Sequence, residues 1–378
     1  MPVQKINIQE FLLLAKQYPV LDVRSPGEYA HAHIPASHSL PLFTDEERKQ
    51  VGTAYKQQSR EAAIKIGLDY FGVKMRKMVE EVESLIAARC LLAEKMQHPN
   101  NEQQATGNTV LIHCWRGGMR SAAVAWLLDM YGFKVYLLAG GYKAYRKWVL
   151  AQFEKEYNFN IIGGYTGSGK TLLLHELKDQ QKMIIDLEGL ANHKGSAFGT
   201  LEGILQPGQE MFENLLGEAL YVAGCSLEEK DSSTNKEQRP TDIFLEDESQ
   251  RIGNLQIPMA FWRNMRKSPV FFMDIPFEER LVYITEEYGK LKKEAIKEAI
   301  LRIQKRLGGL ETKNALNFLE AVNMKECFRI LLTYYDKWYH KGLHNRENIA
   351  ALLNKIPCAG VDTKINTHKI LTCNIVSA

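Results

Sequence analysis

Short apolar runs alternate with amphipathic stretches over roughly the first 150 residues. Residues 19–23 and 109–114 are compact runs rich in Val, Leu and Ile, which is typical of buried strands. Residues 44–57 begin with Thr44 and Glu47 at capping-box spacing, which predicts a helix. This alternation predicts an α/β fold. The same pattern predicts helices at 73–96, 121–132 and 142–153, a strand at 134–138 and a polar loop at 97–108.

A second α/β pattern begins at residue 158. A strand at 158–163 runs into a glycine-rich turn, and a helix at 171–180 and a strand at 183–187 follow it. The later predicted features are strand ends at 243–249 and 269–275, an inserted polar loop at 226–241, helices from about Phe277 onward and an irregular tail at 356–378.

The bulk composition excludes several classes of protein. The chain has 378 residues, enough for two domains, and is 45% hydrophobic and 25% charged, as in ordinary globular proteins. No apolar run reaches the ~18 residues of a membrane span, and the N-terminus lacks a signal pattern, so we expect a cytoplasmic protein. Six cysteines without a CxxC pair suggest neither zinc nor disulfides. The net charge of +3 does not decide for or against nucleic acid, but basic clusters stand at 290–306 and 337–346.

The stretch HCWRGGMRS at 113–121 places a cysteine between a strand and a helix, inside a glycine-rich turn. Backbone N–H groups in such a turn form an anion-binding nest, which lowers the pKa of a thiol. We therefore expect Cys114 to be a thiolate nucleophile, with Arg116 and Arg120 as partners for an oxyanion. Ser121 is expected to begin the helix and to hydrogen-bond the thiolate.

Two classes of enzyme carry such a loop. The spacing from Cys114 to Arg120 fits the C-x5-R pattern of cysteine phosphatases. The flanking stretches at 21–37 and 137–148 resemble the opening and closing segments of the rhodanese family, in which the positions of Asp22 and Arg24 organise the core around the loop. Because many rhodanese sulfurtransferases have a loop one residue shorter, this loop alone leaves sulfurtransferase, selenotransferase and phosphatase open.

The stretch GYTGSGKT at 164–171 matches the P-loop pattern without a mismatch, between a predicted strand and a predicted helix. Its backbone amides would bind a polyphosphate, Lys170 would contact the outer phosphates, and Thr171 would hold Mg²⁺. The candidate phosphate-binding residues are Gly164, Thr166, Gly167, Ser168, Gly169, Lys170 and Thr171.

Acidic residues at two further strand ends could complete a metal site or act as a base. Asp186 follows the predicted strand at 183–187 and is the candidate second metal ligand beside Thr171. The same positions equally suit solvated or helix-capping carboxylates. The other candidates around this site are Glu188, His193, Glu246, Asp247 and Arg251.

The stretches at 113–121, 163–171, 186–199 and 246–253 together resemble the tRNA 2-selenouridine synthase family over nearly the whole chain. That family joins a rhodanese domain to a P-loop domain. The resemblance implies a tRNA partner and a two-step transferase reaction on wobble 2-thiouridine. Geranyl diphosphate first alkylates the sulfur at the P-loop domain, and selenium from selenophosphate then replaces it via Cys114, carried as a selenopersulfide. A selenophosphate-supplying synthase is a further expected partner.

The fold class expected from these observations is α/β, with a rhodanese-like parallel-sheet domain followed by a P-loop NTPase-like domain with a helical, basic C-terminal region. Aromatic residues among the lysines of that region, such as Trp338 and Tyr339, could stack on tRNA bases or face a core. Two other functions remain open: an ATP-dependent tRNA sulfurtransferase, with ATP as the P-loop ligand, and a rhodanese-fold phosphatase fused to a nucleotide-binding module. The expected domains are residues 1–150, 151–280, 281–355 as the tRNA-binding region and 356–378 as the tail.

Overall fold

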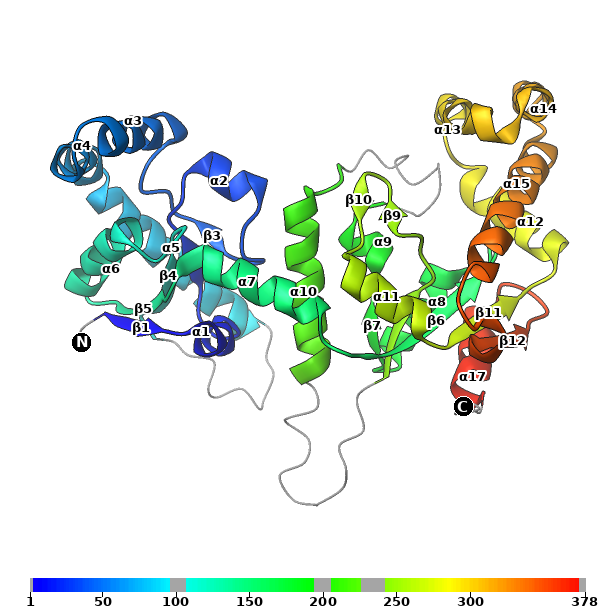
Figure 1. Cartoon of the computed structure of the whole chain (residues 1–378), viewed down its shortest axis with the longest axis horizontal. Coiled ribbons are helices and arrows are strands. Elements are labelled where there is room, and N and C mark those ends of the chain that lie inside the picture. Colours follow the sequence, from blue (N-terminus) through cyan, green and yellow to red (C-terminus); the bar gives the residue numbers. More distant parts are fainter. Residues whose placement is uncertain (1–2, 96–106, 194–204, 226–241, 374–378) are drawn as a thin grey trace, which may run out of the picture. The chain divides into compact units, whose positions relative to one another are not determined.

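The computed structural model describes residues 3–95, 107–193, 205–225 and 242–373. They form two compact units, Met1–Ala151 and Gln152–Ala378, each with its own parallel sheet (Figure 1). Both units therefore have the α/β architecture that the sequence predicts. In the described part of the chain, no helix is both long and apolar enough to cross a membrane.

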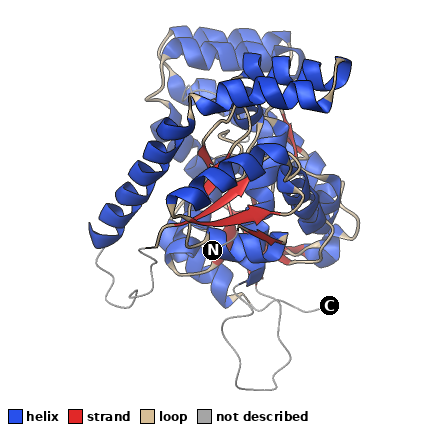
Figure 2. Ribbon diagram, turned by 90° about the vertical axis from the view of Figure 1, so that its left-hand side faces the viewer, coloured by secondary structure: helices blue, strands red, loops and turns tan. Residues whose placement is uncertain are grey.

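The sheet of the first unit has five parallel strands in the order β1-β5-β4-β2-β3. All five residues of β4 are buried, and its middle residues Val110, Leu111 and Ile112 are apolar, as expected of a strand without a solvent face. Figure 2 shows strands surrounded by helices. The strands are β1 (Gln4–Ile6), β2 (Val20–Asp22), β3 (His38–Ser39), β4 (Thr109–His113) and β5 (Lys134–Leu138).

Seven helices accompany this sheet among the described residues. The predicted capping box at Thr44 and Glu47 is confirmed: the Thr44 side chain accepts from the Glu47 N–H, and the Glu47 carboxylate accepts from the Thr44 N–H. The helix that it begins packs against the next one, which the sequence pattern did not reveal. The helices are α1 (Ile8–Ala15), α2 (Pro26–His31), α3 (Asp45–Gln57), α4 (Arg60–Gly72), α5 (Met75–Lys95), α6 (Met119–Tyr131) and α7 (Gly141–Phe153).

The sheet of the second unit also has five parallel strands, in the order β12-β11-β6-β8-β7. The central strand β6 leads into the P-loop, so the loop emerges at the carboxyl edge of the sheet. The strands are β6 (Asn158–Gly164), β7 (Met183–Ile185), β8 (Asp242–Glu246), β11 (Val270–Asp274) and β12 (Leu353–Pro357), and a separate antiparallel hairpin comprises β9 (Arg251–Ile252) and β10 (Leu255–Gln256).

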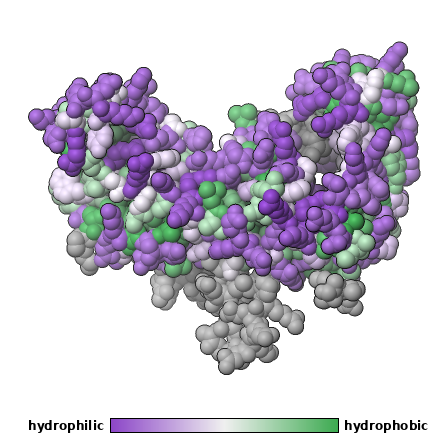
Figure 3. Space-filling view, viewed as in Figure 1, coloured by the Kyte–Doolittle hydropathy of each residue, from purple (hydrophilic) through white to green (hydrophobic). Residues whose placement is uncertain are grey.

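Most of the chain after Phe277 is helical, as predicted. The helices α12 to α15 share a core of their own around Leu281, Ile300, Phe328 and Leu332. The face of this bundle that Figure 3 shows is mostly hydrophilic. The helices of the second unit are α8 (Lys170–Asp179), α9 (Leu187–Leu190), α10 (Gln209–Cys225), α11 (Met259–Lys267), α12 (Phe277–Tyr288), α13 (Lys293–Leu307), α14 (Gly309–Glu320), α15 (Met324–His344), α16 (Ile349–Leu352) and α17 (Thr363–Thr372).

The expectation of an irregular tail at 356–378 is wrong for the part that the structure describes. The strand β12 pairs in parallel with β11, and α17 packs against α8. Ile356 and Ile370 are buried in one core with side chains of α8. The helical period of α17 was hidden because two of its buried residues, Asn366 and Thr367, are polar. Other predicted features, at 97–106, 194–199 and 226–241, lie outside the described residues.

Candidate functional site

The cysteine loop joins β4 to α6 and is held by hydrogen bonds from the first turn of α7. The backbone N–H of Tyr142 donates to the Cys114 carbonyl at 2.8 Å, and that of Lys143 donates to the Trp115 carbonyl at 3.0 Å. Gly141 makes this approach possible, because a Cβ there would lie 2.3 Å from the Cys114 carbonyl oxygen. Its φ of +60° also favours glycine. The loop shape is therefore fixed by backbone contacts with the segment at 137–148.

The Cys114 thiol is 3% exposed, and its sulfur lies 3.1 Å from the Ser121 hydroxyl, as the sequence predicted. The helix α6 begins two residues earlier than expected, at Met119. Burial raises the pKa of the thiol, but the Ser121 hydroxyl and the backbone N–H groups of Ser121, Arg116 and Gly118 outweigh it. The pKa of Cys114 is therefore held below its ordinary value.

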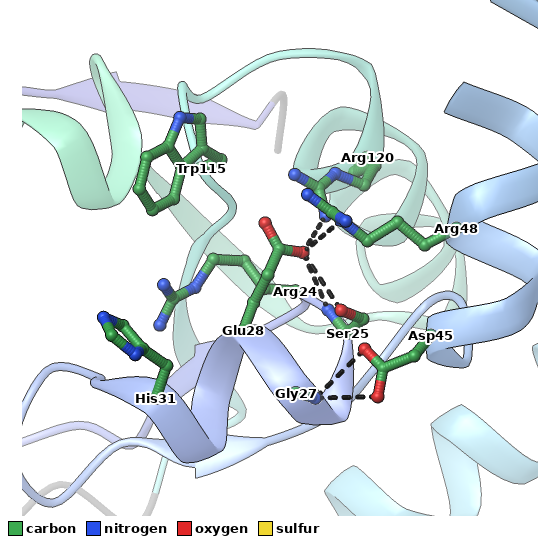
Figure 4. Close-up of a pocket in the computed structure, with 9 residues that line it drawn as sticks. All are labelled: Arg24, Ser25, Gly27, Glu28, His31, Asp45, Arg48, Trp115 and Arg120. Atoms are coloured by element: carbon green, nitrogen blue, oxygen red, sulfur yellow. Dashed lines mark hydrogen bonds and ion pairs between the residues drawn. The ribbon is translucent and has the colours of Figure 1, made fainter. Parts of the chain in front are cut away.

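A cavity of about 420 Å³ adjoins the loop and carries the charges expected of an anion site (Figure 4). Arg120 and Arg48 both reach the Glu28 carboxylate, at 2.7 Å and 2.8 Å. Burial raises the pKa of Glu28, but the two arginines and the Ser25 N–H outweigh it, so the pKa lies below its usual range and the carboxylate is ionised at neutral pH. The lining residues are Arg24, Ser25, Gly27, Glu28, His31, Asp45, Arg48, Trp115 and Arg120.

These contacts refine the roles expected for the two loop arginines. Arg120 lines the cavity but pairs with Glu28, and Arg116 is exposed on the loop. The sequence analysis missed Glu28 and Arg48. Glu28 looks like a capping residue of α2, which it also is, and Arg48 lies on a helix without a motif.

Behind the loop, Asp22 and Arg24 form a buried pair with two hydrogen bonds from the Arg24 Nε and Nη2 atoms. The Arg24 guanidinium also stacks 3.8 Å above the Tyr142 ring. His113 beside them is fully buried, and burial lowers its pKa to about 4, so it is neutral although Asp22 lies 3.7 Å away. Asp22 and His113 support the loop from behind and do not line the cavity, whereas Arg24 does line it.

In the second unit, the P-loop connects β6 to α8 and is held by the C-terminal helices. The Arg280 guanidinium donates to the Thr166 carbonyl at 3.0 Å and pairs with Asp336 at 2.7 Å. The Gly164 N–H donates to the Tyr339 hydroxyl at 3.0 Å, and Lys170 Nζ donates to the Gly164 carbonyl at 3.0 Å. The helices α12 and α15 therefore support the P-loop directly. The remaining P-loop candidates Gly167, Ser168, Gly169 and Thr171 lie on the same turn and the first turn of α8.

The two candidate metal ligands, Thr171 and Asp186, form hydrogen bonds with different partners in the structure. The Thr171 hydroxyl donates to Glu188 at 3.1 Å. Asp186 instead caps α9 by accepting from the Gly189 N–H at 2.6 Å, and its other oxygen lies 2.9 Å from His175 Nε2. The carboxylate that contacts the Thr171 hydroxyl is therefore that of Glu188, and Asp186 contacts α9 and His175 instead.

The negative charges of these carboxylates disfavour the ionised forms of Glu246 and Glu248. Glu246 is 1% exposed, one of its oxygens accepts from the Leu187 N–H at 3.2 Å, and the other has no hydrogen-bond partner among the described residues. Burial, together with the charges of Asp186 and Glu188, raises the pKa of Glu246 well above its usual range. Burial and Glu188 raise the pKa of Glu248 in the same way. A cation here would relieve this repulsion.

The residue types fit Mg²⁺, which prefers hard oxygen ligands and usually keeps only one or two protein carboxylates beside substrate phosphates. Thr171 and Glu188 would hold it. Over the described ranges, no three carboxylate, imidazole or thiol groups converge to hold an ion without further ligands.

The remaining candidates, Asp247, His193 and Arg251, lie in three different surroundings. Asp247 accepts from the Tyr339 hydroxyl at 2.8 Å and pairs with Arg346, so it links β8 to α15. The His193 N–H donates to the Glu188 carbonyl at 3.0 Å, which places His193 beside α9. Arg251 is exposed on β9, and no hydrogen bond joins its side chain to the P-loop in the described structure.

The aromatic residues of α15 divide between two environments. Tyr339 lies against the P-loop, whereas Trp338 is 43% exposed. Arg306 and Lys341 approach the Trp338 ring, with distances to its centroid of 5.9 Å and 5.4 Å. Trp338 is therefore the more exposed of these two aromatic side chains.

Comparisons with known proteins cover both units. The family model described as the tRNA 2-selenouridine synthase AAA domain matches residues 157–355, and that of the rhodanese-like domain matches residues 8–147. The tRNA 2-selenouridine synthase of Marinobacter nauticus is 32% identical over 369 residues, covering 89% of this chain and 91% of that protein. The synthase of the same name from Bdellovibrio bacteriovorus is 32% identical over 377 residues, covering 88% and 91%. The solved N-terminal domain of a protein from Clostridium difficile 630, a protein that is described as ATP/GTP-binding, is 35% identical with a TM-score of 0.33, covering 39% of this chain and 99% of that one.

Proposed function

Because the chain belongs to the tRNA 2-selenouridine synthase family, it is a tRNA-modifying transferase, and we propose that it converts wobble 2-thiouridine into 2-selenouridine in two half-reactions. The first adds a geranyl group to the sulfur at the P-loop. The second replaces the S-geranyl group with selenium at the Cys114 loop. Two separate sites suit two reactions that need different chemistry.

In the first half-reaction, the thiocarbonyl sulfur attacks C1 of geranyl diphosphate. The C–O bond breaks, diphosphate leaves, and the uracil N3 proton is lost. The leaving diphosphate gathers negative charge, which the P-loop amides and Lys170 are placed to stabilise. When bound, Mg²⁺ supplies further positive charge there. Thr171 and Glu188, whose side-chain oxygens lie 3.1 Å apart, would hold it.

In the second half-reaction, the Cys114 thiolate attacks the phosphorus of selenophosphate and expels hydroselenide. Hydroselenide attacks C2 of the S-geranyl base, geranylthiolate leaves, and the selenium-bound proton moves to N3. Water then hydrolyses the phosphocysteine to phosphate and free Cys114. This route conserves electrons throughout. The selenopersulfide that the family resemblance suggests would require attack on selenium, which expels phosphite and then needs a reductant to release the selenium.

The observation that carries this proposal is a thiol of lowered pKa in a loop beside a cavity whose Glu28 carboxylate is ionised. Arg120 and Arg48 hold Glu28 in its ionised form, and the Gly27 N–H donates to both oxygens of the Asp45 carboxylate. A phosphatase would need an acid to protonate an alkoxide. Hydroselenide is a far weaker base than an alkoxide and leaves without one.

The test is rapid quenching of the protein with selenophosphate in the absence of RNA, followed by mass spectrometry of the Cys114 peptide. We expect a mass gain of one phosphoryl group, and none in Cys114→Ser. A gain of one selenium without phosphorus would contradict attack at phosphorus. No adduct of either kind, with selenation intact in Cys114→Ser, would remove Cys114 from the reaction.

A further inference from the structure

A second cavity, of about 650 Å³, lies in the first unit between the α3–α4 pair and the start of α6. Its floor is apolar and includes Phe43, Ala63 and Phe71, all buried. Its volume is within the ~300–1,000 Å³ of small-molecule sites. Neither half-reaction as described above uses it.

The walls of this cavity hold large apolar side chains that remain exposed. Tyr55, Leu68 and Met119 are 54%, 57% and 51% exposed, and all three line it. Single exposed apolar residues are common, but three around one hollow indicate a site for an apolar ligand.

This cavity adjoins the cavity beside the cysteine loop. Arg48 and Arg120 line both cavities, and Met119 and Arg120 begin α6 directly after the loop. Figure 4 shows these two arginines side by side on Glu28. A molecule could therefore place an apolar group in one cavity and its reacting atom in the other.

The charged side chains among the described residues that line the apolar cavity are all positive. Arg48, Lys49, Lys56 and Arg120 line it, and no Asp or Glu does so among the described lining residues. This suits an apolar chain joined to a polyanion, since RNA phosphates attract such a cationic rim. It suits a neutral lipid or an apolar face of a partner protein less well.

We propose that this cavity binds the geranyl chain of S-geranyl-2-thiouridine in tRNA and so presents C2 of the base at the Cys114 loop. The inference rests on the proposed function, because it assumes a geranylated intermediate. It explains why the first half-reaction installs an isoprenoid chain: the chain both improves the leaving group and anchors the base for selenation. The S-geranyl group is the occupant of this cavity until geranylthiol departs.

The test compares two anticodon stem-loop RNAs, one with S-geranyl-2-thiouridine and one with S-methyl-2-thiouridine, as substrates for selenation by the full chain with selenophosphate. The readout is the ratio of their kcat/KM values. Gly52→Leu fills the cavity: Gly52 lines it on α3, and a Cβ there would meet no atom within 4 Å. Gly72→Leu is the matched control, since Gly72 is also helical with open space at its Cβ but does not line the cavity.

We expect the wild type to prefer the geranyl RNA by about tenfold or more, as an apolar pocket does for a longer chain. Gly52→Leu lowers this preference by about tenfold, and Gly72→Leu keeps it. Leu68→Ser lowers it as well, whereas Leu13→Ser, at 53% exposure on α1, does not.

Three other results are possible, and each would contradict a different claim. If the wild type selenates the geranyl RNA and Gly52→Leu and Leu68→Ser keep the full preference, the cavity assignment is wrong and the proposed function stands. If the two variants instead slow geranylation of 2-thiouridine RNA, the cavity serves geranyl diphosphate in the first half-reaction. If the wild type cannot selenate geranyl RNA at all, the proposed function fails and this inference with it.

Discussion

Gly141→Ala should abolish most of the selenation activity while leaving geranylation intact. A Cβ at Gly141 would lie 2.3 Å from the Cys114 carbonyl oxygen, 2.5 Å from the Gly117 nitrogen and 2.9 Å from the Arg116 nitrogen. All three are backbone atoms, so no side chain can turn aside. Ordinary contact begins at 3.4 Å, and the cysteine loop must therefore shift by roughly 1 Å.

The two costs of this substitution can be separated. A non-glycine residue at φ +60° costs about 1–2 kcal/mol of stability. Displacing a nucleophile by about 1 Å costs on the order of 100-fold in rate. Gly132→Ala supplies the control, because Gly132 has a φ of +114° but open space at its Cβ.

The assay measures kcat for selenation of a geranylated stem-loop RNA, the geranylation rate on 2-thiouridine RNA and thermal unfolding. We expect both variants to lose some stability and only Gly141→Ala to lose selenation. If Gly141→Ala selenates at the rate of Gly132→Ala, the start of α7 does not set the position of Cys114, and this account of the loop is wrong.

Three further results are expected. Ser121→Ala removes a hydrogen bond that lowers the pKa of Cys114, so the pH midpoint for alkylation of Cys114 by iodoacetamide should rise above that of the wild type; an unchanged midpoint would contradict the role of Ser121. Glu188→Gln should slow geranylation by about tenfold or more and raise the Mg²⁺ concentration that it needs, and an identical Mg²⁺ dependence would place the ion elsewhere. Hydrolysis of aryl phosphates should be negligible because Glu28 is ionised, and efficient Cys114-dependent turnover would favour a phosphatase.

Both reactive loops could be predicted from the sequence because each is contiguous. A strand, a glycine turn and a helix follow one another within about ten residues, and local spacing alone places Cys114 directly after β4 and Lys170 at the start of α8. The Ser121 contact belongs to the same turn and was predicted for the same reason.

The partners that come from distant segments could not be predicted. Tyr339 reaches Gly164 across 175 positions, and Arg280 reaches Thr166 across 114. Neither residue stands in a motif, and Tyr339 belongs to an aromatic stripe that equally suits a core or an RNA surface. The capping role of Asp186 could not be separated from metal binding in the sequence, because both use the same residue type at the same kind of position, and its role as a metal ligand stays a prediction.

The most direct test of two half-reactions at two sites is the product analysis of two variants on two RNAs. Cys114→Ser and Lys170→Ala are each supplied with selenophosphate, geranyl diphosphate and stem-loop RNA carrying either 2-thiouridine or S-geranyl-2-thiouridine, and the nucleosides are identified by mass spectrometry. Cys114→Ser should accumulate S-geranyl-2-thiouridine from the first RNA and form 2-selenouridine from neither. Lys170→Ala should form 2-selenouridine from the second RNA, with geranylation of the first reduced on the order of 100-fold. If Cys114→Ser forms 2-selenouridine, or if folded Lys170→Ala fails on the pre-geranylated RNA, the assignment of one half-reaction to each loop is contradicted.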